Sequence, residues 1–225
     1  MAGLLKLSTF AVSLDGFGTG DGLTEQEPFG HAGERLHTWM FRTRAWHEKT
    51  GQDGGSTGVD DDFMRAHWVG FGAAIMGRGK FWTGAGPIPG DWQGFWGTEP
   101  PFQTPVVVLT HQHRPDLQMA GGTRFLFRDT TPAEALAEAR ELAEGQDVRL
   151  GGGVRTVREF LEADLVDELH VVIVPIVLGR GQRLWDGLES LEDRFDLRLE
   201  PGDGGATHLT GVRRHTRAGR RPGPG

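Results

Sequence analysis

The chain has 225 residues, a formal net charge of -7, no cysteine and 36 glycines. The lack of cysteine excludes disulfides, thiolate metal sites and a cysteine nucleophile, and the negative charge argues against a nucleic-acid partner, because phosphate binding needs a basic face. No apolar run reaches the roughly 18 residues of a membrane helix and the start of the chain lacks a signal-peptide pattern, so we expect a cytoplasmic protein with no membrane partner.

The first half of the chain predicts two strands and two helices. Residues 4–14 are typical of a strand that ends at the Asp15-Gly16 turn, and a Gly- and acid-rich loop follows. Residues 34–46 predict a helix, with Leu36, Trp39, Met40 and Thr43 on one face. Asp60–Asp62 begin a second helix, where acids favour the positive end of the dipole. Residues 72–76 are a short apolar strand.

Residues 84–105 combine glycine, proline and tryptophan and show little regular pattern. Two interpretations remain open for this aromatic loop. It is either a lid whose rings stack on a planar substrate, or part of the core or of a dimer interface, since exposed tryptophans must be covered.

The second half alternates strands and helices. We expect strands at 105–110, 124–128, 147–150 and 168–178, with a bend at Pro175, and helices at 131–144 and 154–163. Residues 195–200 and 206–213 predict an antiparallel hairpin. The alternation predicts an α/β fold with a mostly parallel twisted sheet flanked by helices, in a single domain spanning 1–213, followed by a flexible basic tail at 214–225.

Two glycine-rich turns are candidate anion sites. In Met76–Lys80, glycine permits close backbone approach while Arg78 and Lys80 add positive charge; a tight strand-to-helix turn explains the same residues. The triplet Gly151–Gly153 lies directly before a helix, where free N–H groups favour a pyrophosphate. His111 and His113 have the spacing of a metal pair, but no third ligand is evident, so we expect no metal.

Taken together, SLDG at 13–16, MGR at 76–78, VVVLT at 106–110, LGGG at 150–153 and LVDELHVVIVPIVLGRGQRLW at 165–185 resemble the dihydrofolate reductase superfamily. The resemblance is closest to the reductase domain of the bifunctional riboflavin-biosynthesis deaminase/reductase. It implies a dihydrofolate-reductase-like sheet of eight or nine strands, and NADPH as the cofactor.

The resemblance also implies roles for individual residues. Gly77, Arg78 and Lys80 would meet cofactor phosphates. Thr110 and His111 would flank the adenosine and its 2′-phosphate, and Ala11 would lie beside the nicotinamide carboxamide. Gly151, Gly152, Gly153 and Val154 would hold the pyrophosphate, with a cis peptide expected between Gly151 and Gly152. The sequence departs from the family at Lys80, where dihydrofolate reductases have threonine.

These expectations describe a reductase that transfers hydride from NADPH to a small, planar heterocycle of the pteridine or pyrimidine type, or to a small carbonyl or imine. Asp15 and Glu34 are the candidate catalytic acids, and Trp39 and Trp82 the candidate substrate contacts, all four on chain position alone. No acid aligns securely with the pterin anchor, so folate reduction is not expected. The alternative is a non-catalytic, nucleotide- or ligand-binding member of the fold. We also expect a homodimer, formed through the apolar strand at 169–178 and the aromatic loop.

Overall fold

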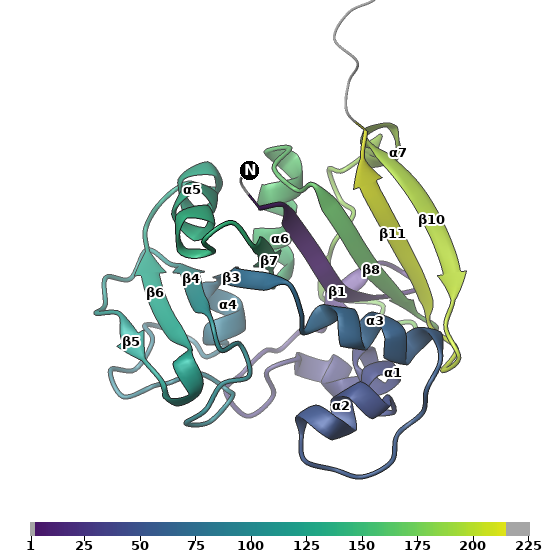
Figure 1. Ribbon diagram of the computed structural model, residues 1–225, viewed down its shortest axis with the longest axis horizontal. Coiled ribbons are helices and arrows are strands. Elements are labelled where there is room, and N and C mark those ends of the chain that lie inside the picture. The colour runs from purple at the N-terminus through teal and green to yellow at the C-terminus, as the bar shows by residue number, and fades with distance from the viewer. Residues whose placement is uncertain (1–2, 215–225) are drawn as a thin grey trace, which may run out of the picture.

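A computed structural model describes residues 3–214 of the chain, which form an α/β fold around one large sheet (Figure 1). Nine strands run in the order β10-β11-β8-β1-β7-β3-β4-β6-β5, and a two-stranded ribbon pairs β2 with β9. The strands are β1 (Leu5–Ser13), β2 (Phe17–Thr19), β3 (Phe71–Gly77), β4 (Pro105–Leu109), β5 (Leu117–Gln118), β6 (Arg124–Arg128), β7 (Asp147–Leu150), β8 (Glu168–Val174), β9 (Gln182–Arg183), β10 (Phe195–Pro201) and β11 (Thr207–Arg213).

The pairing confirms the predicted class. The six strands from β8 to β6 are parallel, whereas β5, β10 and β11 pair antiparallel. The helices are η1 (Gly30–Leu36), α1 (Thr38–Phe41), α2 (Arg44–Lys49), α3 (Val59–His67), α4 (Arg78–Phe81), η2 (Ala120–Gly122), α5 (Pro132–Leu142), α6 (Val154–Glu162) and α7 (Leu191–Arg194). No helix within residues 3–214 is long and apolar enough to cross a bilayer.

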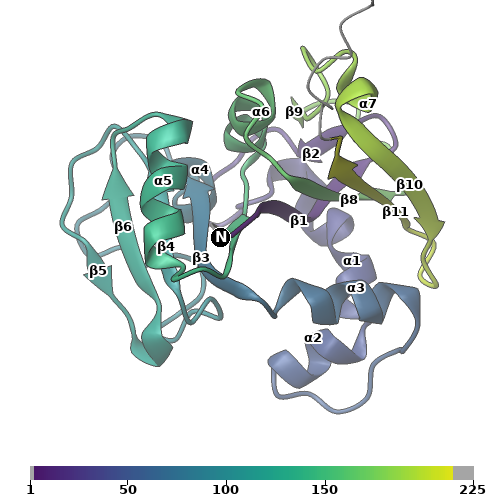
Figure 2. The ribbon, with the colours of Figure 1, turned by 45° about the horizontal axis from the view of Figure 1, so that its top comes forward.

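The central strands are buried on both faces, which explains their nearly continuous apolar sequences. In β3, Ala73 and Ile75 pack in a core with α5 and α6, whereas Ala74 and Met76 pack in a separate core under the aromatic loop. Helices α1 to α3 gather together on a different part of the sheet, beside β1 and β8 (Figure 2). The aromatic loop and the segment that follows α3 come close to each other at β7, where the guanidinium of Arg149 lies near the rings of both Phe102 and Trp68.

The helix predicted at residues 34–46 is broken into three short pieces. Gly33 has φ of +52°, and Thr43 has extended backbone. The Thr43 hydroxyl accepts a hydrogen bond from the Trp46 amide at 3.2 Å, so Thr43 begins a new helix instead of extending the old one. By contrast, the capping box at Thr131 and Glu134 forms as predicted.

Strand β8 ends at Val174, directly before Pro175, rather than continuing to residue 178. It lies between β1 and β11, so both of its edges are paired. Strand β8 therefore has no free edge to offer a second copy, and the expected homodimer through residues 169–178 and the aromatic loop stays a prediction. The strand at that end of the sheet with an unpaired side is β10, where Leu197 and Leu199 are exposed.

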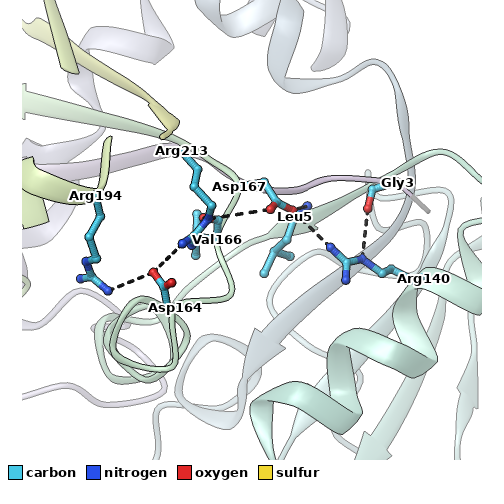
Figure 3. A network of polar contacts seen from close by, with 8 residues as sticks. All are labelled: Gly3, Leu5, Arg140, Asp164, Val166, Asp167, Arg194 and Arg213. Carbon is cyan, nitrogen blue, oxygen red and sulfur yellow. Dashed lines mark hydrogen bonds and ion pairs between the residues drawn. The ribbon is translucent and has the colours of Figure 1, made fainter. Parts of the chain in front are cut away.

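An ion-pair network ties the two ends of the described chain together (Figure 3). Arg213 of β11 contacts Asp164 and Asp167, and Arg140 of α5 donates to Asp167 at 3.2 Å. Asp167 also accepts from the Leu5 amide at 2.8 Å. This network lies where β1 and β8 begin, at the opposite end of the strands from the glycine triplet. Arg214, the first residue of the predicted tail, pairs with Asp196 at 2.7 Å, and residues 215–225 lie outside the described residues.

Candidate functional site

The glycine triplet connects the carboxyl end of β7 to α6 and is bonded to the neighbouring strand. The Gly151 amide donates to Ile75 O, and the Gly77 amide donates to Gly152 O, both at 2.8 Å. Gly152 has φ of +103°, a conformation that glycine adopts without steric cost. The cis peptide joins Gly152 to Gly153, so the expectation of one between Gly151 and Gly152 was wrong by one residue.

Beyond the triplet, the N-terminus of α6 has no side-chain cap. Gly153 is the N-cap residue, and a methyl group built on it would meet no atom within 4 Å. Val154, the first residue of the helix, is buried. The start of α6 therefore borders open space at Gly153, and the backbone N–H groups at a helix start can bind a phosphate group.

Lys80 lies along the triplet rather than pointing away from it. Its Nζ donates to Gly151 O at 2.5 Å, and its Cδ would lie 3.9 Å from a methyl group on Gly152. Burial, assisted by the positive charge of Arg149, lowers the pKa of Lys80 to about 8. Lys80 is therefore a partly buried amine that is charged at neutral pH.

The other predicted phosphate contacts are also engaged within the protein. The Arg78 guanidinium donates to the carbonyls of Gly84 and Gly86, where it holds the start of the aromatic loop. His111 is exposed and pairs with Asp129 at 2.7 Å. Thr110 is buried at the end of β4, beside the end of β3.

Ala11 is buried on β1, opposite Val172 of β8. The preceding residue, Phe10, lies against the triplet: its ring is 3.2 Å from the position of a methyl group on Gly152 and 2.8 Å from one on Gly18. Gly18 and Gly152 thus leave room for the Phe10 ring. Phe10, Lys80 and the triplet therefore lie together. Ala11 packs instead in the core beneath η1 and helices α1 to α3.

Asp15 is committed to the turn after β1. Its carboxylate accepts hydrogen bonds from Ser13 Oγ at 2.6 Å, the Gly179 amide at 2.7 Å and the Leu178 amide at 3.1 Å. Burial alone would raise the pKa of Asp15, but these hydrogen bonds outweigh it and lower the pKa to about 2. A carboxylate so firmly ionised is a poor proton donor.

The remaining three candidates lie elsewhere. Glu34 is exposed on η1 and lines a shallow surface depression with Asp21, Glu27 and His31. Trp39 is buried against the His208 ring, and Trp82 is buried against Trp92. The two tryptophans are core residues, contrary to the expectation that they line a substrate site. The aromatic loop likewise covers β3, β4 and β6 as core, which favours the second of its two interpretations.

A polar cluster lies between α3 and the sheet, and no sequence pattern predicts it. Arg149 of β7 is 5% exposed and donates to His67 O at 3.1 Å. His67 in turn contacts Ser8 Oγ at 3.0 Å and Thr9 Oγ1 at 2.8 Å through Nδ1. Burial, then the charge of Arg149, lowers the pKa of His67 well below its usual value, so this imidazole is neutral. An arginine inside the short strand DVRL was the only sequence signal for the cluster.

A second unpredicted group is a buried relay from Asp60 to His208 and His170. Asp60 Oδ1 lies 2.7 Å from His208 Nε2, and His208 Nδ1 lies 2.9 Å from His170 Nε2. The Phe63 ring stacks on both imidazoles. Asp60, which the sequence analysis assigned to the helix dipole, therefore joins α3 to β11 and β8. The three residues come from distant parts of the sequence, so no local pattern indicates the relay.

Comparison with known proteins places this geometry in a family. Residues 7–203 match the RibD C-terminal domain. The uncharacterized protein YwjB of Bacillus subtilis is 30% identical over 81 residues, which are 36% of this chain and 46% of YwjB, so the match spans about half of that relative.

Solved structures share the fold at low identity. A putative riboflavin biosynthesis protein from Shewanella sp. PV-4 superposes with a TM-score of 0.57 at 21% identity, covering 96% of this chain and all of the other. Dihydrofolate reductase from Enterococcus faecalis, complexed with NADP(H), gives 0.51 at 15% identity, covering 96% and 99%. The fold is thus the dihydrofolate-reductase-like one that the sequence motifs predicted, and the chain belongs to the RibD C-terminal domain family.

Proposed function

We propose that the protein is an NADPH-dependent reductase acting on a small heterocycle of the pteridine or pyrimidine type. The observation that supports this most directly is the glycine triplet. It positions the uncapped N-terminus of α6 at the carboxyl ends of β7 and β3, with open space at Gly153. Ligands of open parallel sheets bind at such strand ends.

The residues present fit a dinucleotide. The α6 N-terminus would hold the pyrophosphate through backbone N–H groups, and Thr110 and His111 would lie near the adenosine. When bound, the nicotinamide supplies the hydride, and the protein positions it and excludes water. Phe10 and the triplet would form the apolar side of that position. Lys80 is the group with an available proton beside the triplet, since Asp15 is held ionised.

Titration of the protein with NADPH and NADH, followed by nucleotide fluorescence, tests the cofactor assignment. We expect NADPH to bind at least about tenfold more tightly, since one charge-assisted contact to the 2′-phosphate contributes about 1.5–3 kcal/mol. Arg78 and His111 are the basic side chains that we assign to that position. Equal affinities would remove the 2′-phosphate assignment, and no binding of either nucleotide would contradict the proposed function.

A ligand-binding protein without turnover is the second candidate. It is favoured by the Phe10 ring, which already lies against Gly152, and by the engagement of Asp15 in its turn. NADPH oxidation measured with a panel of pterins, pyrimidines and quinones separates the two candidates. Tight NADPH binding with no oxidation by any compound would favour the second.

A further inference from the structure

The relay of Asp60, His208 and His170 joins a helix, two strands and a turn at one buried point. Asp60, in the first turn of α3, lies 2.7 Å from His208 Nε2 of β11 and accepts from the Gly204 amide of the β10–β11 turn at 2.6 Å. His208 Nδ1 lies 2.9 Å from Nε2 of His170 on β8. The start of α3 therefore docks on the sheet and on the turn through the same three side chains (Figure 1).

The relay is closely packed. His208 is fully buried, and Asp60 is 3% exposed. A methyl group on Gly202 would collide with Asp60 Oδ1, so only glycine lets the turn approach the carboxylate this closely. The Trp39 ring of α1 meets the His208 ring edge-on, with 5.4 Å between their centres. A hydrogen bond lost inside the relay therefore leaves a buried polar group unpaired, which is costly.

The hydrogen bonds fix where the protons of the relay lie. Both oxygens of the Asp60 carboxylate accept, so His208 Nε2 carries a proton and donates it. When His208 is neutral, its Nδ1 accepts from the Nε2–H group of His170. One added proton keeps both bonds: it enters at His170 Nδ1, and the Nε2 proton passes to His208 Nδ1. A second added proton breaks the bond between the rings, because two N–H groups then face each other.

The surroundings do not neutralise that second charge. The charged or titratable groups on the elements packed against the relay, besides its own members, are Lys6 of β1, Asp61, Asp62, Arg65 and His67 of α3, Glu168 of β8, Asp196, Arg198 and Glu200 of β10, Asp203 of the turn and Arg213 of β11; α1 has none. The acids among them are either exposed to water, which screens them, or already in ion pairs. Burial, and then the charge of His208, lowers the pKa of His170 to about 3. The docked relay therefore takes up its second proton only in strong acid.

Phe63 is the side chain with room to move away from the relay. Its ring stacks on both imidazoles, with its centre 4.4 Å from that of His170 and 4.3 Å from that of His208. The same residue lines a cavity of about 310 Å³ between α3 and Glu200 of β10. Movement of Phe63 into this cavity would give water access to the two imidazoles.

We propose that the relay is an acid-operated latch: when both imidazoles are charged, the bond between His170 and His208 breaks, and the start of α3 and the β10–β11 turn separate from the sheet. At higher pH the latch holds α3 in place, and with it Trp39 and the core beneath α1 to α3. The latch is independent of the proposed function, because none of its three residues belongs to the region of the glycine triplet.

The test follows the Gly204 amide, whose hydrogen bond to Asp60 exists only while the latch is closed. Hydrogen exchange is measured by NMR between pH 8 and pH 4.5 and corrected for the intrinsic exchange rate at each pH. His170 takes up a proton at its ordinary pKa of about 6.5 in the released form and at about 3 in the docked form. One such proton shifts the equilibrium about tenfold per pH unit, so we expect Gly204 protection to fall about a hundredfold from pH 6.5 to pH 4.5. The Met119 amide, which bonds to Thr123 O in the turn before β6, should change less than threefold.

Matched variants identify the titrating group. His170→Gln keeps a donor to His208, because the Gln amide nitrogen stands close to the position of Nε2, and it takes up no charge. The change in Gly204 protection over this pH range should therefore fall to within threefold. His113→Gln, at an exposed position, should leave the pH dependence as it is. A pH dependence that survives His170→Gln would assign the titration to Asp60 and overturn the proposal, as would pH-independent Gly204 protection in the unmutated protein.

A second measurement needs no variant. In the unmutated protein with ¹⁵N-labelled histidine, a scalar coupling between His170 Nε2 and His208 Nδ1 should be present at pH 8. The His170 ring should stay neutral in the docked protein down to about pH 4.5. No coupling at pH 8, or a His170 ring that becomes charged near pH 6.5 while Gly204 stays protected, would also overturn the proposal.

Discussion

A methyl group at Gly153 should weaken cofactor binding at least tenfold while leaving the fold nearly intact. The methyl would meet no protein atom within 4 Å, and the residue has negative φ of -68°. The loss of folding stability should stay below about 1 kcal/mol, the scale of an N-cap change from glycine to alanine. If the pyrophosphate occupies the open space at Gly153, the methyl would take up part of that space and hinder the approach of the pyrophosphate to α6.

The expected loss of affinity follows from the contacts removed. One or two charge-assisted hydrogen bonds, at about 1.5–3 kcal/mol each, correspond to at least a tenfold rise in Kd for NADPH. Gly152→Ala is a less discriminating variant, because Gly152 has φ of +103° and a side chain there costs about 1–2 kcal/mol of folding stability.

The assay is a fluorescence titration with NADPH, accompanied by thermal unfolding of each variant. Gly90→Ala is the matched control, since Gly90 is exposed in the aromatic loop and a methyl there also meets no atom within 4 Å. Unchanged NADPH affinity in a folded Gly153→Ala protein would refute the assignment of the triplet as the pyrophosphate site.

Three further predictions address stability, assembly and substrate choice. Burial lowers the pKa of His37 to about 4 and that of His170 to about 3, so these residues bind protons less readily in the folded chain than in the unfolded one. Each histidine should therefore lower the free energy of unfolding by about 2 kcal/mol at pH 5 relative to pH 8. Urea unfolding at several pH values measures this, and His170→Gln should make the free energy of unfolding depend less on pH. A free energy of unfolding that does not change with pH in the unmutated protein would contradict the prediction. We propose a homodimer formed by pairing of β10 edges, so light scattering should give twice the chain mass and Leu199→Asp should halve it, whereas a monomeric unmutated protein would exclude it. Turnover of dihydrofolate should remain well below the ordinary enzyme median of about 10 per second, and a rate at that level would show that a pterin-anchoring acid was missed.

Many of the helices and strands could be predicted from the sequence, because residues close together in the chain determine them. The capping box at Thr131 and Glu134 and the apolar strands from β3 to β7 are set by residues a few positions apart. The glycine triplet was also recognisable from the sequence, because three consecutive glycines stand directly before a predicted helix. The helix predicted at residues 34–46 failed because apolar spacing does not reveal that Thr43 would turn its hydroxyl to cap a new helix.

The candidate site was harder to predict because its members meet only through the topology. Arg149 and His67 are far apart in the sequence, and so are Asp60 and His208. Their chemistry arises from burial and pairing across the sheet, which single-chain patterns do not encode. Trp39 was wrongly predicted as a ligand contact from its position in the chain. In the structure its ring is buried against His208, so it is a core residue.

The central position of β1 has a consequence for synthesis on the ribosome. Strand β1 pairs with β7 on one side and with β8 on the other, with Leu5 opposite Val148 and Lys6 opposite Glu168. Neither edge of β1 can therefore form its hydrogen bonds until those later residues have been synthesised. Strands β3, β4 and β6 and helix α5 emerge earlier and can associate among themselves, whereas the first apolar segment stays unpaired until most of the chain has been translated. The nascent chain therefore exposes an aggregation-prone strand for most of its elongation, and a chaperone that shields residues 4–13 should increase the yield of native protein more than one acting after release.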